Sequence, residues 1–240
     1  MTAAAQPVAL VTGAAHRIGA ALASRLHQEG FRVAVHYHHS KDAARQLVAA
    51  LNQVRENSAC ALSADLCVAS APQDLVAELI ANWGQLDLLV NNASIFSSHD
   101  ADSDKMWHCN VHAPYLLSRA AFPHLVVTRG SIINVTDIHA QTPLRGYAAY
   151  CQTKAALAMQ TRALAQEFAP SVRVNAVAPG AILWPEGDNS LDPVIQEKII
   201  AKTLLQRHGK PEYIAQAVMY LINNTYVTSQ ILQVDGGRYS

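Results

Sequence analysis

Short runs rich in β-branched and apolar residues alternate along the whole chain with longer segments of helical periodicity. The predicted strands are Val8–Thr12, Arg32–Tyr37, Cys60–Ser63, Leu86–Asn91, Ser131–Val135, Val172–Ala178 and Ile231–Val234. The clearest apolar helical stripes are Ile18, Leu22 and Leu26 before Gly30, and Ala155, Met159 and Leu164. Because strand and helix alternate, we predict an α/β fold with one doubly wound parallel sheet and helices on both faces.

Composition indicates one domain over residues 1–240 and excludes several classes of partner. The 240 residues include 18 basic and 18 acidic side chains, which cancel, so we expect no nucleic acid and no membrane as partner. The N-terminus lacks the features of a signal peptide, and a cytoplasmic location is expected. Four cysteines without C-x2-C spacing predict neither a zinc site nor a disulfide framework.

The first predicted crossover carries a glycine turn, Thr12 to Gly19. In such a turn the free N–H groups and the following helix N-terminus favour a pyrophosphate, with Gly13 allowing the tight turn and Gly19 close packing. Arg17 stands where many such loops have glycine, and its guanidinium suits a phosphate or a polar substrate edge. A purely structural βα turn is the alternative.

The second predicted strand ends in His36-Tyr37-His38-His39-Ser40, without the acid that usually binds an NAD ribose about 20 residues past the turn. Asp42 lies past the strand end, in a helix that Ser40 would cap. Imidazoles, a hydroxyl and a helix N-terminus suit a 2′-phosphate, so NADPH/NADP+ is the predicted cofactor.

Histidines also recur at His108 and His112, one helical turn apart. Neither they nor the histidines of the second strand are accompanied by an acidic ligand, and neither group reads as H-E-x-x-H. We therefore expect no metal and interpret His108 and His112 as a partly exposed helix face.

Asp137, Tyr150 and Lys154 are the candidate catalytic residues. Tyr150 and Lys154 are spaced i, i+4, so both lie on one face of a helix, and a nearby ammonium is expected to lower the phenol pKa. Tyr150 would then donate the proton that a C=O or C=N bond needs when hydride arrives. A chance pair on a surface helix is the alternative, and Asp137 alternatively caps local N–H groups.

These motifs, taken together, resemble the short-chain dehydrogenase/reductase family over the whole length of the chain. The motifs are the TGxxxxxG turn, Ala64-Asp65-Leu66, Asn91-Asn92-Ala93, Asn110, Tyr150 with Lys154, Pro179-Gly180 and Asp235-Gly236-Gly237. Within the family the chain looks most like the pteridine reductases, including bacterial dihydromonapterin reductase. The features that carry this likeness are Arg17, the HYHxS segment, NNASxF with Ser94 and Phe96, and Asp137 where ketone-reducing relatives have serine.

The resemblance implies a Rossmann-type fold and a role for each matching residue. The cofactor-binding residues would be Gly13, Arg17, Ile18, Gly19, His36, His38, His39, Ser40, Ala64, Asp65, Leu66, Asn92, Ser94, Asn110, Tyr150, Lys154, Pro179, Gly180 and Ile182. The substrate-binding residues would be Arg17, Ser94, Phe96, Asp137, Tyr150 and Trp184, with Phe96 stacked on the pterin. The chain departs from the pattern at His39, where some members have arginine, and at Ile182, which replaces a polar residue of eukaryotic members.

Asp137 bears most directly on the substrate. An ionised carboxylate only accepts hydrogen bonds and would repel a carbonyl oxygen, whereas a pterin offers N–H donors and a C=N bond. Residues 183–193 are rich in turn formers and are predicted to form a mobile substrate loop bearing Trp184.

The leading hypothesis is therefore NADPH-dependent reduction of a dihydropterin (dihydromonapterin, dihydrobiopterin or dihydrofolate) to the tetrahydro form. The alternatives are a 3-oxoacyl-type carbonyl reductase of the same family and a non-catalytic dinucleotide-binding protein. The resemblance also implies a homotetramer that uses the helices carrying Asn110 and Tyr150, with a pterin or folate as the small-molecule partner.

Overall fold

The computed structural model describes residues 6–185 and 190–238, in which a seven-stranded parallel sheet forms the centre of the fold. The sheet has the strand order β3-β2-β1-β4-β5-β6-β7. The strands are β1 (Val8–Val11), β2 (Arg32–Tyr37), β3 (Ala59–Ser63), β4 (Leu88–Asn91), β5 (Ser131–Val135), β6 (Arg173–Pro179) and β7 (Ile231–Val234). The predicted doubly wound parallel sheet is confirmed.

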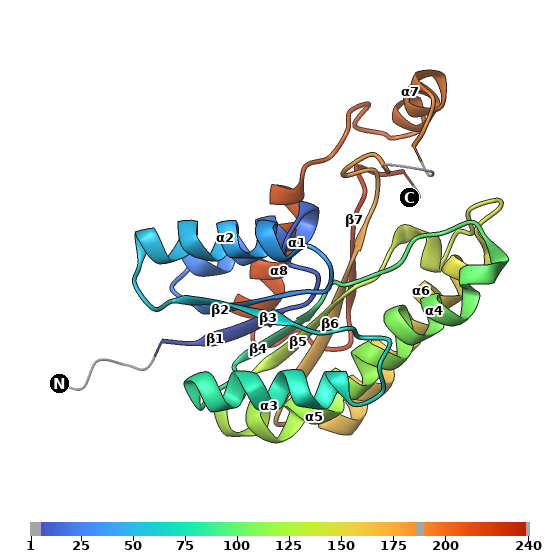
Figure 1. Cartoon of the computed structure of the whole chain (residues 1–240). Coiled ribbons are helices and arrows are strands. Elements are labelled where there is room, and N and C mark those ends of the chain that lie inside the picture. Colours follow the sequence, from blue (N-terminus) through green and yellow to red (C-terminus); the bar gives the residue numbers. More distant parts are fainter. Residues whose placement is uncertain (1–5, 186–189, 239–240) are drawn as a thin grey trace.

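Helices cover both faces of this sheet (Figure 1). The helices are α1 (Arg17–Gln28), α2 (Lys41–Val54), α3 (Ala71–Trp83), α4 (Ser103–Trp107), α5 (Ala113–Thr128), α6 (Ala148–Phe168), α7 (Pro193–Ala201) and α8 (Pro211–Asn223). A π-helical segment, His108–His112, connects α4 to α5, and short 3₁₀ segments cover Asp100–Asp102 and Ile138–Ala140. Helices α1, α2 and α8 pack on one face, and α3, α5 and α6 on the other.

Side chains of β1 show why the strands are apolar throughout. Ala9 and Val11 belong to the core on the α1 side, whereas Val8 and Leu10 belong to the core on the α3 side. Each strand of such a sheet buries both faces, so its sequence is a continuous apolar run rather than an alternating one. This burial explains why the seven strands were recognisable from sequence.

One predicted helical stripe is wrong in part. Along α6, Leu164 is buried as expected, but Met159 is 62% exposed and Ala155 also faces outward. The buried face instead includes Leu157 and Phe168. Alanines recur on several faces of this helix, so periodicity alone did not identify the side that packs on the sheet.

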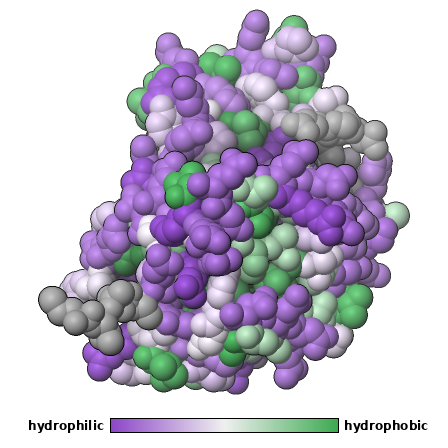
Figure 2. All heavy atoms as spheres, turned by 60° about the vertical axis from the view of Figure 1, so that its left-hand side comes forward, coloured by the Kyte–Doolittle hydropathy of each residue, from purple (hydrophilic) through white to green (hydrophobic). Residues whose placement is uncertain are grey.

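Strand order determines where a ligand can bind. After β3 the chain crosses to the other half of the sheet, so the strand order reverses between the neighbouring strands β1 and β4. Ligands of such folds bind beyond the carboxyl ends of the strands at this point. The face shown in Figure 2 is largely hydrophilic, with hydrophobic residues near its centre and others scattered toward its edges.

Candidate active site

Two cavities lie at the carboxyl edge of the sheet, and most of the predicted site residues line one or both. The glycine-turn cavity, of about 410 Å³, is lined by Gly13, Arg17, Ile18, Gly19, His36, His38, Ala64, Asp65, Leu66, Asn92 and Ser94, among others. The Tyr150 cavity, of about 530 Å³, is lined by Arg17, Ile18, Asn92, Phe96, Asp137, Tyr150, Lys154, Pro179, Gly180, Ile182 and Trp184, among others. Ser94, a predicted substrate contact, thus lines the first cavity and not the second.

The glycine turn is built so that no side chain fits inside it. Gly13 has φ +60°, in the left-handed region, and a Cβ on Gly19 would lie 2.2 Å from the carbonyl oxygen of Gly13. The Asn92 amide donates to the carbonyls of Thr12 and Gly13 at 2.9 and 3.1 Å. The Thr12 hydroxyl, which sequence reasoning did not single out, accepts from the N–H groups of Asn92 and Ala93. These bonds fix the turn against the end of β4, with room for a phosphate-bearing ligand.

His36 has a different task from the predicted one. Its Nδ1 accepts from the Gly13 N–H at 3.0 Å, and its Nε2 lies 3.1 Å from the carbonyl oxygen of Ala64. Burial lowers the pKa of His36 to about 4, so the ring is neutral near pH 7. His36, in β2, therefore links the segments that follow β1 and β3. Its neutral ring supplies no charge for a 2′-phosphate.

His38 and His39 are exposed beyond the end of β2, with ring centroids 3.5 Å apart. The Nε2 of His38 lies 3.8 Å from a carboxylate oxygen of Asp65. Ser40 occupies the predicted N-cap position of α2 but its side chain makes no capping hydrogen bond, and Asp42 lies in the first turn. Neither His39 nor Ser40 lines the glycine-turn cavity, but both adjoin it through His38 and the start of α2.

Arg17 lies between the two cavities. Its backbone has φ +56°, in the left-handed region that non-glycine residues seldom adopt. The guanidinium donates to the carbonyl oxygens of Leu183 and Trp184 at 3.3 and 3.0 Å. Arg17 thus joins the glycine turn to the start of the predicted substrate loop, of which residues 186–189 lie outside the described residues.

Asp137, Tyr150 and Lys154 come together at the carboxyl end of β5. The Tyr150 hydroxyl donates to Oδ2 of Asp137 at 2.9 Å, and the other carboxylate oxygen accepts from the His139 N–H at 2.8 Å. Asp137 therefore caps the 3₁₀ segment, which was the alternative role predicted for it, and also contacts Tyr150. The Lys154 ammonium donates to the carbonyl oxygen of Val135 at 3.0 Å and lies 5.7 Å from the centroid of the Tyr150 ring.

The expected lowering of the Tyr150 pKa is wrong for this structure. Burial, the charge of Asp137 and the hydrogen bond to its carboxylate raise the pKa of Tyr150 well above its usual value. Burial lowers the pKa of Lys154 to about 8, against the opposing effect of Asp137. Because desolvation and the negative charge of Asp137 outweigh the ammonium, Tyr150 carries its proton in this structure, as a proton donor must.

Aromatic rings form one wall of the Tyr150 cavity. Phe96 stacks on Tyr147, with centroids 4.5 Å apart and planes 8° from parallel. It also meets Tyr150 edge to face, at 4.8 Å and 88°. Tyr147 was not identified from sequence, although its position one helical turn before Tyr150 is a usable signal.

Asn110 is buried away from both cavities, contrary to its predicted cofactor contact. Its side chain accepts from the N–H of Ile95 at 2.8 Å and donates to the Ile95 carbonyl at 2.9 Å and to the Thr153 hydroxyl at 3.1 Å. The π-helical segment turns this amide inward. Asn110 thus holds the backbone next to Phe96, which lines the Tyr150 cavity, but does not line that cavity itself.

Trp184 stands at the rim of the Tyr150 cavity, with its ring 4.6 Å from that of His208. Apolar side chains of the following segment, Leu191, Ile195 and Ile199, close the same side. These residues give the outer part of the cavity an apolar lining, which suits a substituent on the substrate better than its polar head.

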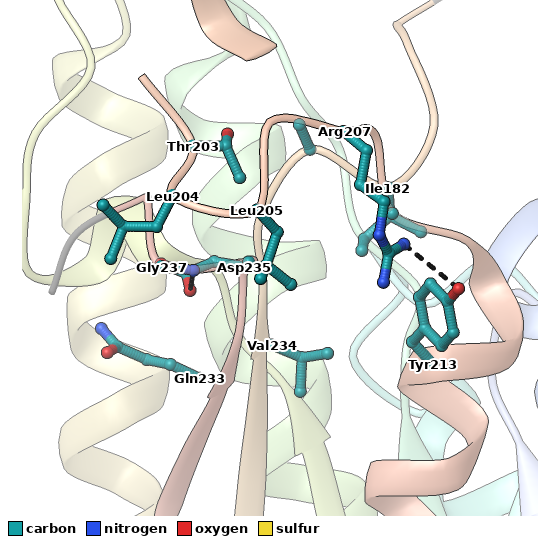
Figure 3. Close-up of a pocket in the computed structure, with 13 residues that line it drawn as sticks. Ile182, Thr203, Leu204, Leu205, Arg207, Tyr213, Gln233, Val234, Asp235 and Gly237 are labelled. Atoms are coloured by element: carbon teal, nitrogen blue, oxygen red, sulfur yellow. Dashed lines mark hydrogen bonds between the residues drawn. The ribbon is translucent and has the colours of Figure 1, made fainter. Parts of the chain in front are cut away.

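A third cavity, of about 430 Å³, lies beside the carboxyl end of β7 (Figure 3). Leu204 and Leu205 cover it, and the Arg207 guanidinium donates to the Tyr213 hydroxyl at 3.1 Å. Ile182 lines this cavity and the Tyr150 cavity, so it forms part of a shared wall. Its lining holds no counterpart of the Tyr150 and Lys154 pair.

In the part of the chain that the structure describes, no three His, Cys, Asp or Glu side chains gather as metal ligands. His108 and His112 are exposed on the π-helical segment, with ring centroids 5.3 Å apart. No helix within the described ranges is long and apolar enough to cross a membrane.

Comparison with known proteins finds relatives that match nearly the whole chain. Residues 13–238 match the family described as enoyl-(acyl carrier protein) reductase. A putative ketoacyl reductase of granaticin polyketide synthase from Streptomyces violaceoruber is 37% identical, covering 97% of this chain and 96% of its own. Pteridine reductase 1 of Leishmania tarentolae is 34% identical, covering 96% of each chain. A 3-oxoacyl-[acyl-carrier-protein] reductase of Staphylococcus epidermidis is 32% identical, covering 96% and 98%.

Proposed function

The chain belongs to the short-chain dehydrogenase/reductase family of NAD(P)-dependent oxidoreductases, and we propose that it reduces dihydropterins to tetrahydropterins with NADPH. The observation that carries this proposal is the contact between the Tyr150 hydroxyl and the Asp137 carboxylate at 2.9 Å. In a carbonyl reductase, a carboxylate at this place would compete with the substrate oxygen for the phenol proton and repel the charge that develops there. A ring nitrogen that ends the reaction as N–H meets no such repulsion.

The chain's own residues supply binding, orientation and the proton. When bound, NADPH supplies the hydride. Tyr150, which is protonated in this structure, donates its proton to the ring nitrogen. Asp137 accepts from pterin N–H or amino groups with its remaining lone pairs. After Tyr150 gives up its proton, the Asp137 carboxylate takes up a proton from solvent and passes it to the phenolate oxygen at 2.9 Å. Lys154, buried beneath the Tyr150 ring, limits the build-up of negative charge when the phenol gives up its proton.

The glycine-turn cavity supports the choice of a dinucleotide. A Cβ on Gly19 would clash with the Gly13 carbonyl oxygen, so this glycine lets the start of α1 pack closely against the turn, where the N-terminus of the helix can face a pyrophosphate. For the 2′-phosphate, His38, His39 and the start of α2 stand where an NAD enzyme would have an acid. NADPH is therefore the proposed cofactor, held by the exposed imidazoles and not by His36.

The test is NADPH oxidation, followed by absorbance, with a dihydropterin and with a β-ketoacyl thioester. We expect the wild type to turn over the dihydropterin, and Asp137→Ser to lose roughly 100-fold in kcat/KM for it while improving on the thioester. Asp102→Ser is the matched control. The Asp102 carboxylate also accepts a hydrogen bond from a hydroxyl, that of Ser97 at 2.7 Å, but it does not line the Tyr150 cavity. Brisk thioester reduction by the wild type, with no dihydropterin turnover, would overturn the proposal.

A 3-oxoacyl-type carbonyl reductase is the second candidate, favoured by two relatives whose names describe ketoacyl or oxoacyl reductases. In that case the wild type should show no dihydropterin activity, and Asp137→Ser should raise the rate of thioester reduction. A non-catalytic dinucleotide-binding protein is disfavoured by the mutual orientation of Asp137, Tyr150 and Lys154, of which Tyr150 and Lys154 are buried.

We also propose a homotetramer. Tyr115 and Leu116 of α5 are 42% and 38% exposed, and Met159 of α6 is 62% exposed. A hollow lined by Val111, His112, Tyr115, Leu116 and Gln160 lies on this side of the molecule. Exposed apolar side chains gathered on two neighbouring helices support association there. Sedimentation velocity of the wild type and of Met159→Glu measures the assembly and its loss.

A further inference from the structure

Three aromatic rings from two distant parts of the chain meet in the Tyr150 cavity. Phe96 belongs to the irregular segment after β4, whereas Tyr147 and Tyr150 lie at and just inside the start of α6. The planes of the Phe96 and Tyr147 rings are 8° from parallel, and the planes of the Phe96 and Tyr150 rings meet at 88°. All three residues line the cavity.

The stack leaves no place for a substrate ring between Phe96 and Tyr147. Their centroids are 4.5 Å apart, a separation at which two rings are already in contact. A flat substrate can therefore extend the stack but not enter it. The plane of Phe96, which is the plane that a flat substrate would follow, is determined by Tyr147.

Both members of the stack have fixed backbones. Beside Phe96, the N–H and carbonyl of Ile95 are both bonded to the Asn110 side chain. Tyr147 is the N-cap residue of α6: its N–H donates to the Leu144 carbonyl at 3.1 Å, and its carbonyl accepts from the Cys151 N–H at 2.9 Å. Tyr150 lies about one turn further along the same helix. The stacked rings and the proton donor therefore keep a fixed orientation relative to each other.

We propose that Tyr147 is a positioning residue that holds the plane of Phe96 and so makes the site select flat, fused-ring substrates over aliphatic carbonyl compounds. This inference rests on the proposed function and adds a residue to it. Aromatic stacking is non-polar and directional, so its loss affects the binding of a planar ring but not the proton transfer from Tyr150. An aliphatic substrate does not use the stack and is expected to be indifferent to it.

The test compares Tyr147→Leu, which removes the stack, with Tyr147→Phe, which retains it without the hydroxyl. For Tyr147→Leu we expect KM for a dihydropterin to rise about three- to tenfold, with kcat and its pH profile within about twofold of wild type. Tyr147→Phe should match the wild type. Tyr220→Leu, at a tyrosine of α8 that is 52% exposed, is the control for the same exchange outside the cavity.

An unchanged KM in Tyr147→Leu, or an equal loss in Tyr147→Phe, would overturn the inference while leaving the dihydropterin activity of the wild type intact. A wild type without that activity would instead overturn the proposed function, and this inference with it. If Tyr147→Leu fails to fold, as judged by circular dichroism and NADP+ binding, Tyr147→Trp replaces it. A wild-type KM in the tryptophan variant supports the role of the stack, and a tenfold rise contradicts it.

Discussion

The glycine-turn cavity and the Tyr150 cavity adjoin each other at one edge of the sheet, but they are built in different ways. The first takes its shape from the backbone: two glycines without room for a Cβ, and amide or hydroxyl groups of Asn92 and Thr12 that hold the turn. The second takes its chemistry from side chains, above all Asp137, Tyr150 and Phe96.

This difference explains why overall similarity does not reveal the substrate. Relatives with different named activities match this chain at similar identity over nearly its whole length. A cavity shaped by backbone depends on the framework that such relatives share. A cavity defined by a few side chains can change its substrate through as few as one or two substitutions.

Tyr150→Phe should separate the two cavities most sharply. It removes the proton donor and leaves the glycine turn untouched, so kcat should fall roughly 1,000-fold, the middle of the range for general acid catalysis. NADP+ binding, measured by calorimetry, should stay within about threefold of wild type. Retained turnover would show that another group supplies the proton, and would contradict the mechanism.

Gly19→Ala should have the converse effect. Its Cβ would lie 2.2 Å from the Gly13 carbonyl oxygen and 2.7 Å from the Asn92 amide nitrogen, so the turn must shift. Overpacking of this kind costs about 1–3 kcal/mol, and we expect NADP+ affinity to fall by about 10- to 100-fold. Gly30→Ala, where the added Cβ meets no neighbour, should lose some stability but no NADP+ affinity. Equal affinities in the two variants would contradict the close backbone approach.

Lys154→Met tests the electrostatic balance of the Tyr150 cavity. Burial lowers the pKa of Lys154 from 10.5 to about 8. Between these pH values the unfolded chain holds more protons at this lysine than the folded chain, so its contribution to the free energy of unfolding rises with pH. The wild type should therefore gain about 1–3 kcal/mol relative to Lys154→Met between pH 7 and 10. Chemical denaturation at both pH values measures this difference, and a constant difference would contradict the burial argument.

His39→Arg should produce the smallest change, because His39 adjoins the glycine-turn cavity without lining it. A guanidinium is permanently charged and bidentate, so the preference for NADPH over NADH should rise about three- to tenfold. The dissociation constant of NADH serves as the internal reference. An equal gain for both cofactors would place His39 near the pyrophosphate and not near the 2′-phosphate.

Much of the framework was predictable from sequence because a parallel sheet buried on both faces needs uninterrupted apolar strands, such as Val8–Val11. The convergence of Asp137, Tyr150 and Lys154 was also predictable, because helical spacing and the end of a strand position them. Local pattern identified the groups, and the topology of the sheet brought them together.

Contacts between distant segments were not predictable in this way. The stacking of Tyr147 on Phe96 and the inward turn of Asn110 depend on how irregular segments pack, and no periodicity reports that. The structural task of His36 and the raised pKa of Tyr150 follow from burial, which a sequence motif does not measure. The expected lowering of the Tyr150 pKa was wrong for that reason.

Ile182 gives the molecule an opportunity for selective inhibition. Its side chain separates the Tyr150 cavity from the cavity beneath Leu204 and Leu205, and its terminal methyl group packs over Gly209. Ala181 lines both cavities as well, so a synthetic compound with one arm in each cavity would have to displace the side chain of Ile182 and pass beside Ala181. Such a compound would contact the cavity next to β7 in addition to the catalytic residues.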